Sequence, residues 1–285
     1  MAIGSNSSKN GTLPARKDRV WEIDALRGLL ILSLLAVHLY HTVDAFCVGG
    51  IYKIEPYEYV NTTDPLHFWF DWGEDGRIFR AFLPADIFSV WNHSGVAGFF
   101  VISGISCLFS RNNLRRGIIT LIAAYALSAF TGLLAFWTGD PGQFIRFGAL
   151  HCYGYCQIIY YFLFEKRKTW VLLSAAAVVL AVGYYLRCNP VSVDTSLLLP
   201  FGVYENGVNA RDYWPIFPML GWLLCGAALG KRFYAERKSL LPTCFLNKWT
   251  RPLQVMGRHS GKIYIAQFIL YPAVFFGIGW VFNLL

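Results

Sequence analysis

The sequence has little charge for its length, and acidic residues are scarcer than basic ones. Asp, Glu, Lys and Arg make up 15% of the 285 residues, with 17 acidic against 25 basic side chains and a net charge of +8. Soluble domains contain about 25% charged residues, so this composition excludes an ordinary water-soluble enzyme. The 55% of hydrophobic and 17% of aromatic residues exclude a disordered chain. Because the apolar runs are continuous rather than alternating, we expect an all-α membrane protein and not a transmembrane β-barrel.

Cysteine is also sparse and irregularly placed. The seven Cys residues match neither a zinc ribbon nor a disulfide framework. Several lie inside apolar runs, where a thiol behaves as a small hydrophobic group. Pairing of Cys47 with Cys188 stays open, and no metal site is predicted from these residues.

The N-terminal segment lacks the features of a cleavable export signal. Residues 1–22 are polar and basic, and the apolar run that follows has no small-residue cleavage site. We expect residues 1–22 to form a cytoplasmic basic tail. The remaining residues, 23–285, are expected to form a single transmembrane domain whose first helix is retained as a signal anchor.

Seven segments are apolar and long enough to cross a bilayer, which takes about 20 residues. Gly and Pro punctuate their ends, as helix breakers do, and no internal repeat stands out. The sequence therefore predicts a polytopic transmembrane helix bundle with about seven spans. The predicted spans are residues 23–43, 89–109, 117–138, 146–164, 170–187, 213–230 and 261–283.

The distribution of charge predicts the orientation of these spans. With the N-terminus in the cytoplasm, most Lys and Arg residues fall in inside loops and most acidic residues in outside loops, as the retention of basic residues in the cytoplasm requires. This gives an N-in, C-out topology with an acidic, aromatic external loop at 45–88 and a basic internal loop at 231–260. The internal loop suits either anionic lipid headgroups or a phosphorylated cofactor, and no nucleic acid partner is expected.

The first predicted helix carries a stripe of ionisable residues, each of which costs ~2–3 kcal/mol or more in lipid. Arg27 and His38 are 11 residues apart, so they lie within roughly 20° of one face and ~16 Å apart along the axis. Asp24 and His41 join the stripe at a spacing of three residues. The stripe either anchors the helix at the headgroups or faces the bundle interior and lines a path.

Histidines on other predicted spans fall at a similar depth. His93 at the start of the second span and His151 in the fourth lie near the outer leaflet, as His38 and His41 do. Four imidazoles at one depth favour a shared site, although a lone membrane histidine is more often a satisfied core residue. Further side chains predicted to line the path are Arg146, Tyr153 and Gln157 in the fourth span and Tyr264 and Gln267 in the last.

Five segments together resemble one known family. They are RVWEIDALRGLLILSLLAVHLYHTVDAF, GFFVISGISCLFSRNNLRRG, IRFGALHCYGYCQIIYY, FPMLGWLLCGAALG and MGRHSGKIYIAQFILYP. In this order, over roughly residues 19–285, they resemble the heparan-alpha-glucosaminide N-acetyltransferase catalytic-domain family, in particular its short bacterial members. The spacing of Arg27 and His38 also resembles the Arg-x10-His signature of bacterial integral-membrane O-acyltransferases. The last helix departs from the family pattern, because Gln267 stands in place of a histidine.

The resemblance implies an acyltransferase, for acyl groups other than amino-acyl groups, in the bacterial cytoplasmic membrane. Such an enzyme takes an acetyl group from its co-substrate, cytoplasmic acetyl-CoA, and delivers it to an extracytoplasmic glycan or other amino or hydroxyl acceptor. A histidine acts as the general base or the acyl carrier, and His38, His93 and His151 are the candidates. His67 competes with His93 for the place of the family's loop histidine. Which histidine is catalytic stays open, as does formation of a homo-oligomer.

An enzyme of this kind also needs cations for the phosphates of CoA. Six basic residues on the predicted cytoplasmic face are candidates, although retention of the topology explains any one of them as well. The six are Arg111, Arg115, Arg116, Lys231, Arg232 and Arg258.

Two other functions stay open from the residues alone. A zinc-dependent intramembrane hydrolase would use His38, His41 and Asp44 as metal ligands and a metal-activated water as nucleophile. A proton-coupled transporter would use the same polar stripe, although it would be expected to show internal repeats.

Overall fold

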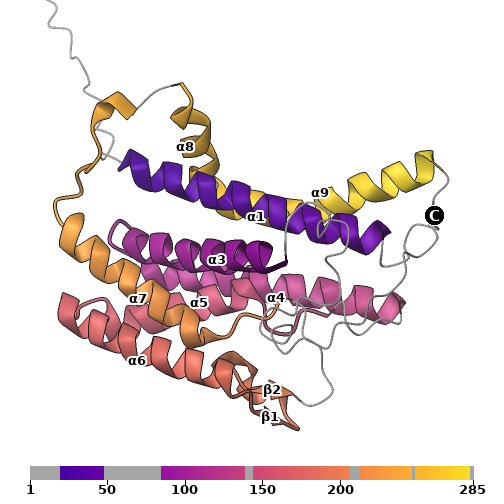
Figure 1. Cartoon of the computed structure of the whole chain (residues 1–285), viewed down its shortest axis with the longest axis horizontal. Helices are drawn as coiled ribbons and strands as arrows, with labels where there is room; N and C mark the ends of the chain where they lie inside the picture. The colour runs from indigo at the N-terminus through magenta and orange to yellow at the C-terminus, as the bar shows by residue number, and fades with distance from the viewer. Residues whose placement is uncertain (1–19, 48–84, 139–143, 206–211, 246–247, 283–285) are drawn as a thin grey trace, which may run out of the picture.

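The computed structural model describes five stretches of the chain, which are residues 20–47, 85–138, 144–205, 212–245 and 248–282. Most of these residues are helical (Figure 1). The predicted basic tail at 1–22 and the predicted external loop at 45–88 lie almost entirely outside the described residues.

Seven long elements make up the bundle. They are α1 (Trp21–Cys47), α3 (Ala85–Cys107), α4 (Asn113–Thr138), α5 (Ala149–Ile159) with the π-helical turn η3 (Tyr160–Phe164), α6 (Thr169–Cys188), α7 (Ile216–Phe233) and α9 (Ser260–Val281). Shorter elements connect them, namely the parallel strands β1 (Ser192–Val193) and β2 (Tyr204–Glu205), the 3-10 turns η4 (Ser196–Phe201) and η5 (Thr243–Phe245), and helix α8 (Thr250–Arg258).

Each of the seven apolar segments predicted as a span coincides with one of the long elements. Within the described residues, four helices are long and apolar enough to cross a membrane, and these are Trp21–Tyr40 in α1, Asn113–Trp137 in α4, Thr169–Cys188 in α6 and Ser260–Val281 in α9. The mostly helical membrane architecture is therefore confirmed. The number of seven spans and the N-in, C-out orientation stay predictions.

The core of the bundle forms around α7, which packs against both α3 and α6. Leu223 and Leu224 of α7 are completely buried, and they share one apolar cluster with Phe100 of α3. A Cβ on Gly226 would overlap the backbone carbonyl of Val101. Glycine at this position therefore lets the backbones of α7 and α3 touch, as in close helix pairs of membrane proteins.

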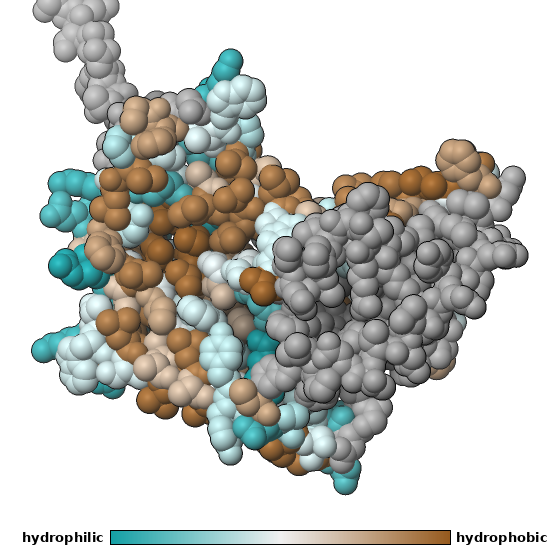
Figure 2. Space-filling model, viewed as in Figure 1, coloured by the Kyte–Doolittle hydropathy of each residue, from teal (hydrophilic) through white to brown (hydrophobic). Residues whose placement is uncertain are grey.

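The outer surface of the bundle is apolar. Phe136 and Trp137 of α4 are 81% and 78% exposed, and Trp280 of α9 is 78% exposed. Figure 2 shows apolar residues across much of the visible face, with hydrophilic residues along the edge where α7 ends. A monomeric soluble protein rarely exposes so much contiguous apolar surface, so this surface suits the lipid around an integral membrane protein.

Several helix termini meet at one end of the bundle, which we name the basic end. Asn113 at the start of α4 donates hydrogen bonds from Nδ2 to the Cys107 carbonyl at the end of α3 (3.1 Å) and to Glu165 Oε1 after η3 (2.6 Å). Lys231 near the end of α7 donates from Nζ to the Glu165 carbonyl (2.7 Å). The ends of α3, η3 and α7 and the start of α4 are thus tied together.

The start of α1 belongs to the basic end as well, because Glu22 Oε1 accepts a hydrogen bond from the Leu240 amide in the stretch after α7 (2.7 Å). At the opposite end, Asp212 before α7 accepts a hydrogen bond from the Ala149 amide at the start of α5 (3.2 Å). Consecutive long helices therefore run in alternating directions, as a transmembrane bundle requires.

Candidate functional site

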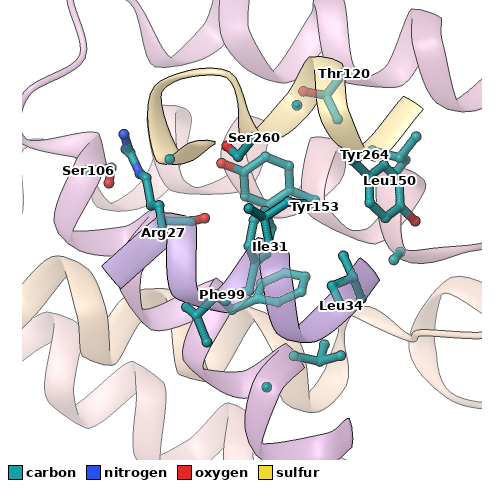
Figure 3. Close-up of a pocket in the computed structure, with 18 of the residues that line it drawn as sticks. Arg27, Ile31, Leu34, Phe99, Ser106, Thr120, Leu150, Tyr153, Ser260 and Tyr264 are labelled. Atoms are coloured by element: carbon teal, nitrogen blue, oxygen red, sulfur yellow. The ribbon is translucent and has the colours of Figure 1, made fainter. Parts of the chain in front are cut away.

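A cavity of about 910 Å³ lies along one face of α1, and its other walls come from α3, α4, α5 and the junction of α8 with α9. Asp24, Arg27 and His38 of the predicted stripe all line it. Figure 3 shows Arg27 toward one end of the cavity and Tyr264 toward the other. The structure thus turns these three residues of α1 toward the bundle interior and not toward lipid.

The end of the cavity nearest the basic end is rich in guanidinium groups. Arg27 Nη1 lies 3.6 Å from Asp24 Oδ1, and Arg258 Nε lies 3.7 Å from Asp24 Oδ2, so two cations share one carboxylate. Arg116 donates a hydrogen bond to the Tyr153 hydroxyl, with its guanidinium 5.6 Å from the centre of that ring. This end therefore has more positive than negative charge and suits an anionic group.

The six predicted cofactor-binding cations separate into two groups. Arg111, Arg116 and Arg258 line the cavity, whereas Arg115, Lys231 and Arg232 do not. The ammonium group of Lys231 donates hydrogen bonds to the carbonyls of Glu165 and Arg167 (2.7 and 2.6 Å), so its contacts hold the helix ends together. Two further cavity cations, Arg237 and Lys262, were not among the predicted site residues, because charge counting cannot tell one inside cation from another.

His38 lies toward the other end of the cavity, ~16 Å along α1 from Arg27 by the rise of the helix. Its ring centre is 5.7 Å from that of Tyr264 and 5.6 Å from that of Phe268, both on α9. Nε2 of Gln267 lies 2.6 Å from His38 Nδ1. The predicted residues His38, Tyr264 and Gln267, which the sequence places on two distant helices, therefore form one cluster.

The Gln267 contact controls which nitrogen of His38 carries the proton. If the amide NH₂ donates to Nδ1, the ring hydrogen sits on Nε2 and that nitrogen cannot accept a proton. Gln267 Oε1 is buried without a hydrogen-bond partner among the described residues. Rotating the amide by a half turn would let Oε1 accept from Nδ1–H and would leave the lone pair of Nε2 free.

Asp212 contributes a carboxylate to the cavity wall that the sequence analysis did not select. Its Oδ2 accepts a hydrogen bond from the Ala149 amide (3.2 Å) and its Oδ1 accepts one from Trp214 Nε1 (3.1 Å). Burial raises the pKa of this carboxyl to about 7, against the opposing effect of these two hydrogen bonds. Its backbone lies in the left-handed region, with φ of 53°, which aspartate tolerates better than most residues other than glycine.

His151, a predicted catalytic residue, does not line the cavity and is held by structural contacts. The Gly148 amide donates to its Nδ1 (3.2 Å), and its Nε2 lies 3.3 Å from Ser128 Oγ. Ser128 uses its own hydroxyl hydrogen on the Ile145 carbonyl (2.6 Å), so Nε2–H must be the donor to Oγ. Both ring nitrogens are therefore occupied, which leaves no lone pair for a base.

His93, another predicted catalytic residue, also lies away from His38. His93 contacts Arg187 and lies against the ring of Trp214, with centres 5.6 Å apart, and it is not on the cavity wall. The side chain of His41 lies outside the described part of the chain. The expectation of one chamber shared by imidazoles of separate helices is thus not met by His93 and His151, because equal depth does not make two helices present the same face.

Of the remaining residues predicted to line the path, some line the cavity and others do not. Tyr153 lines the cavity, while Arg146 pairs with Glu205 at 2.6 Å near the β1–β2 end of the molecule. Gln157 is completely buried, and neither atom of its amide group has a partner among the described residues. Neither Arg146 nor Gln157 contributes to the cavity wall.

A metal site has no support from the part of the chain that the structure describes. Within it, no group of three His, Cys, Asp or Glu residues is placed to hold a metal ion. The ligand set considered for a zinc hydrolase includes His41 and Asp44, whose side chains lie outside the described residues.

Comparison with protein families supplies an independent finding. A family model for the heparan-alpha-glucosaminide N-acetyltransferase catalytic domain matches residues 65–269, well over half of the chain. The match begins after α1, so Arg27 and His38 lie outside it. Comparison with curated proteins and with solved structures finds no match.

Proposed function

Since the chain belongs to the heparan-alpha-glucosaminide N-acetyltransferase catalytic-domain family, we propose that it moves acetyl groups from cytoplasmic acetyl-CoA to an extracytoplasmic acceptor. The family match and the four apolar helices support a membrane acetyltransferase. The acceptor in this proposal is a glycan or another amino or hydroxyl compound. The membrane is the bacterial cytoplasmic membrane.

The proposal includes seven spans with the N-terminus in the cytoplasm. The alternating directions of the seven long helices support this number, because each helix then runs from one end of the bundle to the other. Every second connection therefore lies at the basic end. The cations of the connections at that end, such as Lys166, Lys168 and Lys238, are exposed. Basic residues are retained on the cytoplasmic side of membranes, so the basic end is the cytoplasmic one.

The observation that carries the proposal is the cavity, which joins a cluster of arginines to an imidazole. Arg27 and His38 are ~16 Å apart along α1, about half of the ~30 Å apolar thickness of a bilayer. A donor entering from the cytoplasm would therefore place its anionic part and its reactive part at different depths of one cavity.

Acetyl-CoA is the substrate that these charges suit. Its phosphates would be held by Arg116 and Arg258, with Arg27 deeper in the cavity, since a guanidinium group forms paired hydrogen bonds with phosphate. Asp24 keeps two of these arginines oriented before the donor binds. The acetyl thioester would then extend along α1 toward His38.

In this proposal, His38 is the general base for transfer to the acceptor. With the Gln267 amide turned so that Oε1 accepts from Nδ1–H, Nε2 takes the proton from the acceptor N–H or O–H while the acceptor atom bonds to the acetyl carbon. The carbon–sulfur bond breaks, and the CoA thiolate leaves and takes up the proton that His38 has accepted, which returns the imidazole to its neutral form. Transfer in two steps through an acetylated His38 uses the same geometry. Asp212 and Trp214, which also line the cavity, would orient the acceptor.

The test is transfer of labelled acetyl from acetyl-CoA to amino sugars by the purified chain in nanodiscs, where both faces are accessible. His38→Gln should lower the transfer rate by ~10²–10⁴-fold, the usual contribution of a general base. His259→Gln is the matched control, because that imidazole is exposed at the junction of α8 with α9. Wild-type turnover in His38→Gln would remove His38 from the mechanism and leave the family membership untouched. Amino-sugar uptake into proteoliposomes without acetyl-CoA would instead favour a transporter.

A further inference from the structure

The stretch of residues 237–258, which we name the α8 segment, connects α7 to α9 at the basic end and contains no acidic residue. Several of its large apolar side chains are exposed instead of packed into the bundle. Trp249 is the most exposed of them at 75%, and the others are Leu240, Leu241, Phe245 and Val255.

Exposed cations alternate with these apolar side chains. Lys238, Lys248 and Arg251 are exposed, and Glu236, just before the segment, pairs with Lys238 at 2.9 Å. Lys248 Nζ lies 5.5 Å from the centre of the Trp249 ring. An indole beside an ammonium group suits the boundary between acyl chains and headgroups, because the ring is apolar and the cation reaches the phosphates.

The position of α8 agrees with this boundary. The candidate span in α9 begins at Ser260, directly after α8, and the candidate span in α1 begins at Trp21. A Cβ on Gly257 would overlap the Asp24 carbonyl, and one on Gly28 would overlap the Leu253 carbonyl, so α8 touches the backbone of α1 near its start. Figure 1 shows α8 reaching α1 in the half of α1 nearer to its start. A helix in this place lies at the depth of the headgroups.

The last turn of α8 also reaches the cavity. Gly257 and Arg258 line it, and Arg258 Nε lies 3.7 Å from Asp24 Oδ2. One short helix therefore reaches the arginine end of the cavity with its last turn and exposes Arg251 and Val255 to the surroundings of the protein.

We propose that the α8 segment binds anionic phospholipid headgroups of the cytoplasmic leaflet, with Lys248 and Arg251 on the phosphates and Trp249 between the acyl chains. The bound lipids hold α8 against α1 and so keep Arg258 in the cavity wall. The choice of leaflet rests on the proposed orientation, and the effect on catalysis rests on the proposed function. The lipid contact itself depends on neither.

The experiment measures lipid retention first and activity second. The full chain is purified from membranes, and the phosphatidylglycerol that stays bound is quantified by mass spectrometry without any acetyl-CoA. The double variant Lys248→Gln/Arg251→Gln should bind phosphatidylglycerol roughly 30-fold more weakly, since each cation contributes ~1 kcal/mol near an anionic surface. The matched control is Lys166→Gln/Lys168→Gln, which removes two exposed cations at the same end and should bind as the wild type does.

Activity is then compared in nanodiscs of phosphatidylcholine with and without phosphatidylglycerol. Phosphatidylglycerol should lower the KM for acetyl-CoA of the wild type and of the control, but not of Lys248→Gln/Arg251→Gln or Trp249→Ala. Equal lipid retention by the two double variants would overturn the proposal. Unchanged retention with lost CoA binding in Lys248→Gln/Arg251→Gln would do so too, because the segment would then hold cofactor phosphates.

Discussion

The side-chain amide of Gln267 meets the imidazole of His38 where α9 packs against α1, with its Nε2 2.6 Å from Nδ1 of the ring. The two residues are 229 positions apart in the chain. The orientation of this amide decides which ring nitrogen holds the proton, so α9 determines the chemistry that a residue of α1 can perform.

Replacing Gln267 should therefore affect turnover more than binding. Gln267→Leu removes the partner of Nδ1, so the ring is free to adopt either tautomer, and we expect kcat to fall by roughly 10- to 100-fold, at the low end of the effect of losing the base itself. The KM for acetyl-CoA should change little, because the arginines lie at the other end of the cavity. Gln267→His, which restores a hydrogen-bonding ring, should recover much of the rate. Equal losses in both variants would show that Gln267 does not position His38.

Arg116 and Arg115 form a matched pair for the donor site. Arg116 lines the cavity beside Tyr153, whereas its neighbour Arg115 is exposed and does not line it. Arg116→Gln should raise the KM for acetyl-CoA roughly 10- to 100-fold, since a hydrogen bond to a charged group contributes ~1.5–3 kcal/mol. Arg115→Gln should leave it unchanged. Steady-state kinetics measures the KM of both variants, and thermal unfolding checks that both are folded. Equal KM values would show that Arg116 does not bind the phosphates of acetyl-CoA.

Asp212 should make stability depend on pH. Its pKa is raised from 3.8 to about 7 in the folded chain, so between these values the folded state holds a proton that the unfolded state has lost. The free energy of unfolding should therefore fall as the pH rises from about 4 to about 7, and should stay level above that. Asp212→Asn should remove this contribution. Thermal unfolding across this pH range measures it, and identical slopes in both proteins would contradict the assignment.

Gly257 tests the contact that holds α8 against α1. A Cβ at this position would overlap the Asp24 carbonyl, so Gly257→Ala should force α8 away and destabilise the fold by ~1–3 kcal/mol. Arg258 would move with it, and the KM for acetyl-CoA should rise.

Gly277→Ala is the control for this contact, because a Cβ there meets no atom within 4 Å. It should be neutral or stabilising by up to ~1 kcal/mol, as alanine is favoured over glycine inside helices. Unfolding midpoints and acetyl-CoA kinetics of the two variants are the measurements. A Gly257→Ala chain as stable and active as the wild type would mean that the contact is not rigid.

Much of the helical architecture could be predicted because apolar length is a local property. Each of the seven apolar segments coincides with a long helical element, since a backbone in lipid must satisfy its own hydrogen bonds within the segment. The alignment of Asp24, Arg27 and His38 along one stripe was predictable for the same kind of reason, because the period of the α-helix determines which residues of a single helix share a face.

The amino acid sequence by itself therefore determined which segments form helices and which residues of each helix share a face. Only the tertiary structure decided which faces meet. It brought Gln267 to His38, turned His93 and His151 away from the cavity, and added Asp212 from a connection that composition alone describes as a loop. The physical reason is that the rotation of one helix against another depends on side-chain packing between residues far apart in the chain, and no local spacing encodes it.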